Sequence, residues 1–129
     1  MFAPAGELQI INLKIMKNKL IIMVVLVFFS CNEEVEICKS LNSKDKDEII
    51  RGAFEAGNTG NKKYIPLLLK NANDCRCSTN IHFKGISVYE AKMFAIKKIS
   101  GKESPSAIGR MPDSLVIKYY MSLFPSSER

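Results

Sequence analysis

Apolar residues recur every three or four positions after residue 46, and this spacing restricts the fold more than any other feature of the chain. Four stretches show it: about 47–56, 62–73, 87–100 and 113–124. The spacing matches the period of an amphipathic α-helix, whereas a half-buried strand would alternate apolar and polar residues. No alternating stretch of useful length is found in the sequence. The pattern therefore predicts an all-α fold.

Charged residues and a glycine mark the ends of the first predicted helix. Asp45, Asp47 and Glu48 stand at its start, where the helix dipole favours negative charge. Gly57 is expected to end it, because glycine readily takes the left-handed conformation found at helix C-termini. Residues 58–61 then form a short turn.

The later predicted helices carry similar local signals. Pro66 falls in the first turn of the second helix, where its missing N–H removes no intrahelical bond. Ser87 is an expected N-cap of the third helix, and Glu90, three residues on, completes a capping box. Residues 74–85 and 101–106, rich in polar residues and turn formers, are predicted to be loops.

A run of ten apolar residues, Leu20 to Phe29, follows the basic residues Lys17 and Lys19. A membrane-spanning helix needs ~20 apolar residues, whereas the apolar core of a signal peptide has ~7–15. We therefore predict a signal peptide over residues 16–30 and regard residues 1–15 as an extension before the true start. An amphipathic helix continuing through this region is the alternative.

The sequence at the end of this run resembles the cleavage site of a bacterial lipoprotein signal. In that family the cysteine that follows a small residue is acylated and becomes the new N-terminus. Ser30 and Cys31 fit, whereas Phe28 and Phe29 stand where the family has leucine and a small residue. The resemblance covers residues 16–34, and it implies export, lipidation at Cys31 and a place in the cell envelope, on the periplasmic or surface side of a membrane. Plain secretion with cleavage nearby is the alternative.

The segment that follows Cys31 is polar with scattered apolar positions. Residues 31–46 are therefore predicted to be a lipidated tether, with about one helical turn around residues 35–41. Acyl chains on the cysteine would hold the protein firmly on a membrane, since two membrane-binding signals already suffice for stable attachment. The tether would lead to a helical domain over residues 47–125.

Residues 49–70 resemble a HEAT-type repeat of the short, lyase-associated kind. The matching positions are Ala53, Gly57, Gly60, Ile65, Pro66 and Leu68. Residues 88–104 resemble the first helix of a following repeat, and aligning Ala53 on Ala95 gives a shift of 42 residues, within the ~40–47 of this class. The resemblance implies antiparallel helical hairpins that form a fragment of an α-α superhelix of about four helices. An unrelated four-helix bundle is the alternative.

Three further cysteines are available for chemistry. In an oxidising compartment we predict a disulfide between Cys38 and either Cys75 or Cys77, with unpaired thiols as the alternative. These three thiols and His82, the single histidine, would also make a legal zinc ligand set, although the gap between Cys75 and Cys77 is not the usual one. His82 is also the only imidazole that could serve a thiol nucleophile.

No catalytic constellation, metal site or cofactor motif stands out, and the charge after Cys31 is a well-mixed +4 without a basic stripe for nucleic acid. The sequence therefore predicts a non-enzymatic, membrane-anchored module that binds or scaffolds a protein partner and takes no cofactor, nucleic acid or small-molecule substrate. An acidic partner would meet a margin of lysines: Lys62, Lys63, Lys92, Lys97 and Lys98. The alternative is a thiol or metal protein, redox-active or zinc-binding, that uses Cys75, Cys77 and His82.

Overall fold

The chain separates into two compact units, Met1–Val35 and Glu36–Arg129, which we describe one at a time. The computed structural model describes residues 18–19, 21–23 and 32–125. The predicted extension over residues 1–15 and the predicted lipidation site Cys31 lie outside the described residues, as does most of the predicted signal peptide over residues 16–30. Among the residues that are described, no helix is both long enough and apolar enough to cross a membrane.

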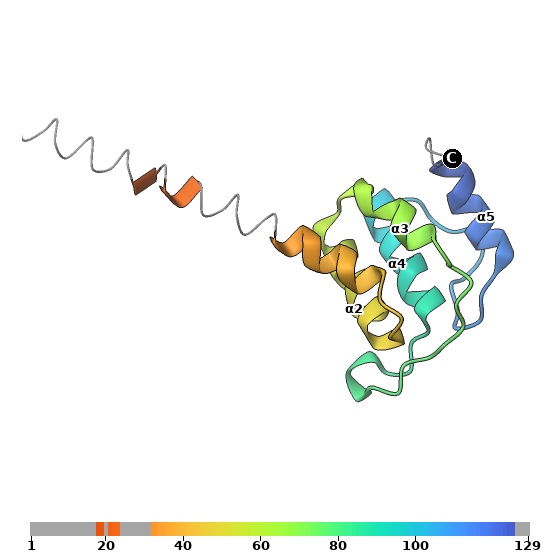
Figure 1. Ribbon diagram of the computed structural model, residues 1–129. Helices are drawn as coiled ribbons and strands as arrows, with labels where there is room; N and C mark the ends of the chain where they lie inside the picture. The colour runs from red at the N-terminus through yellow and green to blue at the C-terminus, as the bar shows by residue number, and fades with distance from the viewer. Residues whose placement is uncertain (1–17, 20, 24–31, 126–129) are drawn as a thin grey trace, which may run out of the picture. The chain divides into compact units, whose positions relative to one another are not determined.

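The second unit is built from helices (Figure 1). Its α-helices are α2 (Lys46–Thr59), α3 (Ile65–Leu69), α4 (Val88–Ser100) and α5 (Ser114–Leu123), with 3-10 turns η1 (Lys62–Tyr64) and η2 (Ile81–Phe83) between them. Residues 32–41 are helical as well. Within residues 32–125 the only extended pairing is an isolated antiparallel bridge between Cys77 and Ser87. The all-α prediction is confirmed.

Helix α2 begins where its N-terminal signals indicate but ends later than predicted. The Asp45 carboxylate caps it by accepting a hydrogen bond from the Asp47 N–H at 3.0 Å. The prediction that Gly57 ends the helix is wrong, because Gly60 takes the left-handed conformation with φ of 67°. Gly57 stays inside the helix and is buried, where an added Cβ would lie 3.3 Å from the Ala95 Cα.

Helix α3 is shorter than the predicted helix over residues 62–73. Pro66 lies in its first turn, as expected. After Leu69 the chain becomes extended at Lys70, and Asn71 has a positive φ of 51°. Asparagine accepts this conformation because its short polar side chain can bond locally to the backbone. The helix therefore ends several residues earlier than its apolar pattern suggests.

Helix α4 carries the predicted capping box. The Ser87 hydroxyl accepts a hydrogen bond from the Glu90 N–H at 3.1 Å, and the Glu90 carboxylate accepts one from the Ser87 N–H at 3.4 Å. The predicted loop before it is held against its start, since the Ser78 N–H donates to the Ile86 carbonyl at 2.9 Å. Gly101, with φ of 67°, ends the helix.

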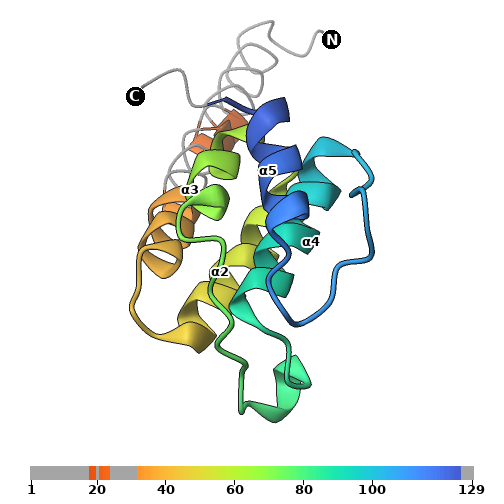
Figure 2. The same cartoon turned by 90° about the vertical axis from the view of Figure 1, so that its right-hand side faces the viewer.

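Helices α2 and α4 lie side by side and run parallel (Figures 1 and 2). Near their N-terminal ends, the Ser78 hydroxyl donates to the Asp47 carboxylate at 2.5 Å and so ties the loop entering α4 to the start of α2. At their C-terminal ends, the Lys98 ammonium donates to the Asn58 side chain at 2.6 Å. Helix α3 packs on α4 and on α5.

The predicted tether contributes to the core. Ile37 and Leu41, which belong to the second compact unit, are 0% and 6% exposed and join the main apolar cluster. Ser40 and Leu41 approach α2 at Gly52, where an added Cβ would lie only 2.8 Å from the Ser40 Cβ. The folded unit therefore begins at about Glu36, before the domain start predicted at residue 47. A helical turn is predicted at residues 35–41 and the segment is helical, but so short a pattern does not show that it packs against α2.

Candidate functional site

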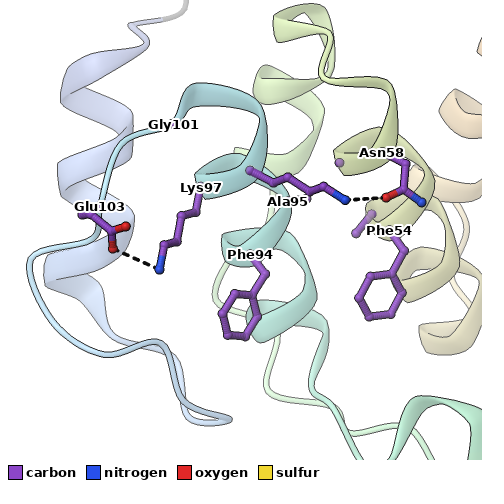
Figure 3. Close-up of a pocket in the computed structure, with 10 residues that line it drawn as sticks. Phe54, Asn58, Phe94, Ala95, Lys97, Gly101 and Glu103 are labelled. Atoms are coloured by element: carbon purple, nitrogen blue, oxygen red, sulfur yellow. Dashed lines mark hydrogen bonds and ion pairs between the residues drawn. The ribbon is translucent and has the colours of Figure 1, made fainter.

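A pocket of about 430 Å³ opens between the C-terminal halves of α2 and α4 (Figure 3). We call it the α2–α4 groove. It is lined by Ala53, Phe54, Gly57, Asn58, Phe94, Ala95, Lys97, Lys98, Gly101 and Glu103. Most of the lining comes from α2 and α4, whose parallel packing positions it, and Gly101 and Glu103 follow the end of α4.

Two phenylalanines form the apolar walls of the groove. Phe54 is 40% exposed and Phe94 is 42% exposed, and Figure 3 shows both rings projecting the same way from neighbouring helices. The Phe54 ring also stacks on Phe83 of η2, with ring centroids 5.9 Å apart. The helical spacing of the sequence groups Phe54 with the core positions of α2, but the structure places it at this surface.

Small residues make the floor of the groove. Ala53 and Ala95 are buried, and Gly57 faces Ala95 so closely that an added Cβ would lie 3.4 Å from the Ala95 Cβ. The small side chains at these three positions leave a hollow between the helices, which Lys98 crosses at one end to reach Asn58. Under the repeat shift of 42, Phe54 aligns with Ile96 and not with Phe94, so the predicted repeat gives no signal for this pair of phenylalanines.

Charged side chains form the rim. The Lys97 ammonium lies 3.0 Å from the Glu103 carboxylate, and the Lys98 ammonium bonds to Asn58. Glu103 is 84% exposed, and an ion pair in such a position contributes only ~0–1 kcal/mol. Lys97 can therefore exchange Glu103 for a carboxylate of a partner at little cost. With two lysines and one glutamate, the rim carries a net charge of +1.

Only part of the predicted lysine margin lies at the groove. Lys97 and Lys98 line it, whereas Lys62 and Lys63 are in η1, where the Lys63 ammonium lies 5.3 Å from the centre of the Tyr64 ring. Lys92 is 3% exposed and lines a different, polar pocket. The prediction of an exposed role for Lys92 is wrong.

The thiols predicted to carry chemistry lie apart from the groove. Cys38, Cys75 and Cys77 are all free, so the disulfide predicted from Cys38 is not formed in this structure. Cys38 is half-buried, and the other two are exposed. Within the part of the chain that is described, no three His, Cys, Asp or Glu side chains come together as metal ligands. The zinc set with His82 is therefore not assembled.

Comparisons with known proteins give no information on function, so the proposal below is argued from the geometry of the α2–α4 groove. No protein-family model matches the chain, and neither the curated proteins nor the solved structures contain a match.

Proposed function

We propose that this chain is a non-enzymatic, membrane-anchored binding module whose α2–α4 groove takes a short amphipathic helix of a protein partner. The observation that carries the proposal is the pair of half-exposed phenylalanines, Phe54 and Phe94, beside a floor of small residues. Apolar side chains of a helical segment, spaced three or four residues apart, are the usual occupants of such grooves. Phenylalanine is also among the aromatic residues that are enriched in protein–protein interfaces.

The charges at the rim indicate which helix would fit. Lys97 and Lys98 flank the apolar walls, and within the described residues the ion pair of Lys97 is with the exposed Glu103. Aspartate or glutamate beside the apolar anchors of the partner would pair with these ammonium groups. Charge complementarity of this kind steers association and fixes orientation more than it adds affinity. The partner segment is therefore expected to be apolar on one face and acidic beside that face.

The helix arrangement supports a HEAT-like interpretation, which we retain as part of the proposal. Two hairpins of a helical repeat array place their first helices side by side in parallel, as α2 and α4 are placed. The contact between Asn58 and Lys98 joins residues 40 positions apart, close to the expected repeat length. Repeat proteins of this class present extended concave surfaces to their partners.

Attachment to a membrane is the second part of the proposal. Acylation of Cys31, after cleavage of a signal peptide over residues 16–30, would place the module in the cell envelope. Metabolic labelling with a palmitate analogue tests this in the wild type and in Cys31→Ala. Label in the wild type that is lost in the variant supports the anchor, whereas an unlabelled wild-type protein refutes it. Groove binding is tested separately, so the two parts can fail independently.

Selection from a phage-displayed library of short random peptides tests the groove. The full chain in detergent serves as bait, and the selected peptides are expected to share apolar residues at helical spacing with acidic neighbours. Phe94→Ser should weaken their binding about tenfold or more, the effect of losing one central aromatic contact. Leu115→Ser is the matched control, because Leu115 is 67% exposed on α5 and lies outside the groove. Equal loss in both variants, or binding unaffected by Phe94→Ser, would refute the proposal.

A further inference from the structure

A second pocket, of about 340 Å³, lies on the other side of α4 and is polar where the groove is apolar. We call it the Lys92 pocket. It is lined by Leu41, Asn42, Ser43, Lys44, Ile49, Leu67, Lys70, Asn71, Asp74, Arg76 and Lys92. Four of these side chains are cationic and one is anionic, which leaves the lining with a net charge of +3. Nothing in the proposed groove function uses it.

Lys92 is the unusual member of this lining. It is 3% exposed, and its ammonium donates to the Lys70 carbonyl at 2.8 Å. Among the described residues this is its only hydrogen bond, and no carboxylate pairs with it. An ammonium has three donors, so two remain for another partner. An unpaired buried charge is costly, and buried lysines normally have an ionic partner.

The carboxylate whose charge acts on Lys92 belongs to Asp74, and it is already paired with Arg76. The Arg76 Nε–H is shared between the two Asp74 carboxylate oxygens, at 3.0 and 3.1 Å, and the Arg76 Nη2 donates to one of them at 2.7 Å. Burial lowers the pKa of Lys92, and the Asp74 charge opposes that shift only in part. The ammonium therefore faces a pocket whose sole carboxylate is held by another cation.

The walls of the pocket are fixed in place by one hydrogen bond between distant segments and one local hydrogen bond. The second terminal nitrogen of Arg76 donates to the Lys44 carbonyl at 2.9 Å, which joins the loop after α3 to the turn before α2. The Asn42 amide donates to the Cys38 carbonyl at 2.9 Å and so closes the end of the preceding helix. Groups held in this way lose little freedom when a ligand binds, and such preorganisation favours affinity.

A purely structural role explains only part of this arrangement. A lysine near the end of a helix can satisfy a backbone carbonyl left without a partner, and the contact with Lys70 at the end of α3 has that geometry. The cap accounts for one donor of Lys92. It does not account for the other two donors, or for the gathering of Lys44, Lys70 and Arg76 around the same cavity.

We propose that the Lys92 pocket binds a phosphate group, with the Lys92 ammonium as the central donor and Lys70 as a cation at the rim. A phosphate carries up to two negative charges and several acceptor oxygens, which match a lining of net charge +3. Lysine binds phosphate as a compact point charge, without the planar geometry that arginine requires. The asparagine amides and the Ser43 hydroxyl supply neutral donors to the remaining oxygens.

Calorimetric titration of the full chain in detergent with inorganic phosphate, glycerol phosphate and acetate tests the proposal. We expect the two phosphates to bind and acetate to bind much more weakly. Lys92→Met keeps the length of the side chain but removes the charge, and it should weaken phosphate binding about ten- to a hundredfold. Lys98→Met is the matched control, because Lys98 is on the same helix but lines the α2–α4 groove, and it should bind phosphate as the wild type does.

Two further measurements keep the test decisive. Without ligand, Lys92→Met should unfold at a higher temperature than the wild type, because an unpaired buried charge has been removed; a pure cap would give the opposite result. If Lys92→Met does not fold, Lys70→Met at the exposed rim replaces it and should weaken phosphate binding about threefold or more. A wild type that binds neither soluble phosphate nor vesicles with phosphatidic acid, or that binds acetate as well as phosphate, overturns the proposal. Binding to vesicles with phosphatidic acid, but to neither soluble phosphate nor vesicles of phosphatidylcholine, would identify a lipid headgroup as the source of the phosphate.

Discussion

Replacing Gly52 by alanine is the sharpest test of where the folded unit begins. The added methyl group would lie 2.8 Å from the Ser40 Cβ, 3.1 Å from the Leu41 N and 3.3 Å from the Leu41 Cγ. Carbon atoms in contact normally stay about 3.5–4.0 Å apart. The nearest obstacles are backbone or Cβ atoms, which no side-chain rotation can move. The helix that ends at residue 41 would have to shift away from α2.

The expected magnitude follows from two opposing effects. Overpacking a well-filled core costs about 1–3 kcal/mol, whereas glycine to alanine inside a helix gains about 0.5–1 kcal/mol. The difference is a loss of up to about 2.5 kcal/mol in the free energy of unfolding, with a midpoint of about 1.2 kcal/mol. For a unit of this size that lowers Tm by about 5–15 °C. If residues 36–41 were a free tether, only the gain would remain and Gly52→Ala would stabilise the protein.

Thermal unfolding of the full chain, followed by circular dichroism, distinguishes the two signs. Gly109→Ala is the control, because nothing lies within 4 Å of an added Cβ there and the substitution should leave Tm unchanged or slightly raised. Ser40→Gly should restore part of the stability lost in Gly52→Ala, since it removes the atom in conflict. A Gly52→Ala variant as stable as the wild type would refute the packing of residues 36–41 on α2.

Three other substitutions probe the elements around the two pockets. Ser87→Ala removes the capping box and should cost about 1 kcal/mol in urea unfolding, while Thr79→Ala, at an exposed loop position, should cost nothing measurable. Gly57→Ala meets Ala95 at 3.3–3.4 Å and should destabilise less than Gly52→Ala does in the same assay. Burial raises the pKa of Tyr120 to about 12, whereas an unfolded tyrosine ionises near 10, so stability should fall as pH rises from about 10 to about 12. Tyr120→Phe should reduce that fall, and a fall of equal size in the variant would exclude Tyr120 as its cause.

Features set by neighbouring residues could be predicted from the sequence. The capping box of α4 needs only Ser87 and Glu90, and the Asp45 cap of α2 needs only its own first turn. The end of α2 could not be predicted in this way, because two glycines stand in one stretch and either could adopt the left-handed conformation. Packing decides between them: Gly57 is needed inside the helix against Ala95, and Gly60 is left to end it.

Features that depend on how two helices approach each other could not be predicted from the sequence. Phe54 follows the same apolar spacing as the buried Ile50, and its exposure results from the position of α4. Lys92 belongs to a type of residue that is mostly exposed. Its burial depends on the early end of α3, which presents the Lys70 carbonyl to α4. Neither fact is encoded in the few residues around the side chain concerned.

The close approach of α2 and α4 connects the stability of the unit with its proposed binding. Gly57 and Ala95 let the two backbones meet, and the small size of these two residues leaves a floor beside Phe54 and Phe94. A residue large enough to fill that floor would also push the helices apart, because the Gly57 position has no spare space. The groove therefore persists only as long as the helix contact does. Its shape is a consequence of the same small residues that hold the fold together.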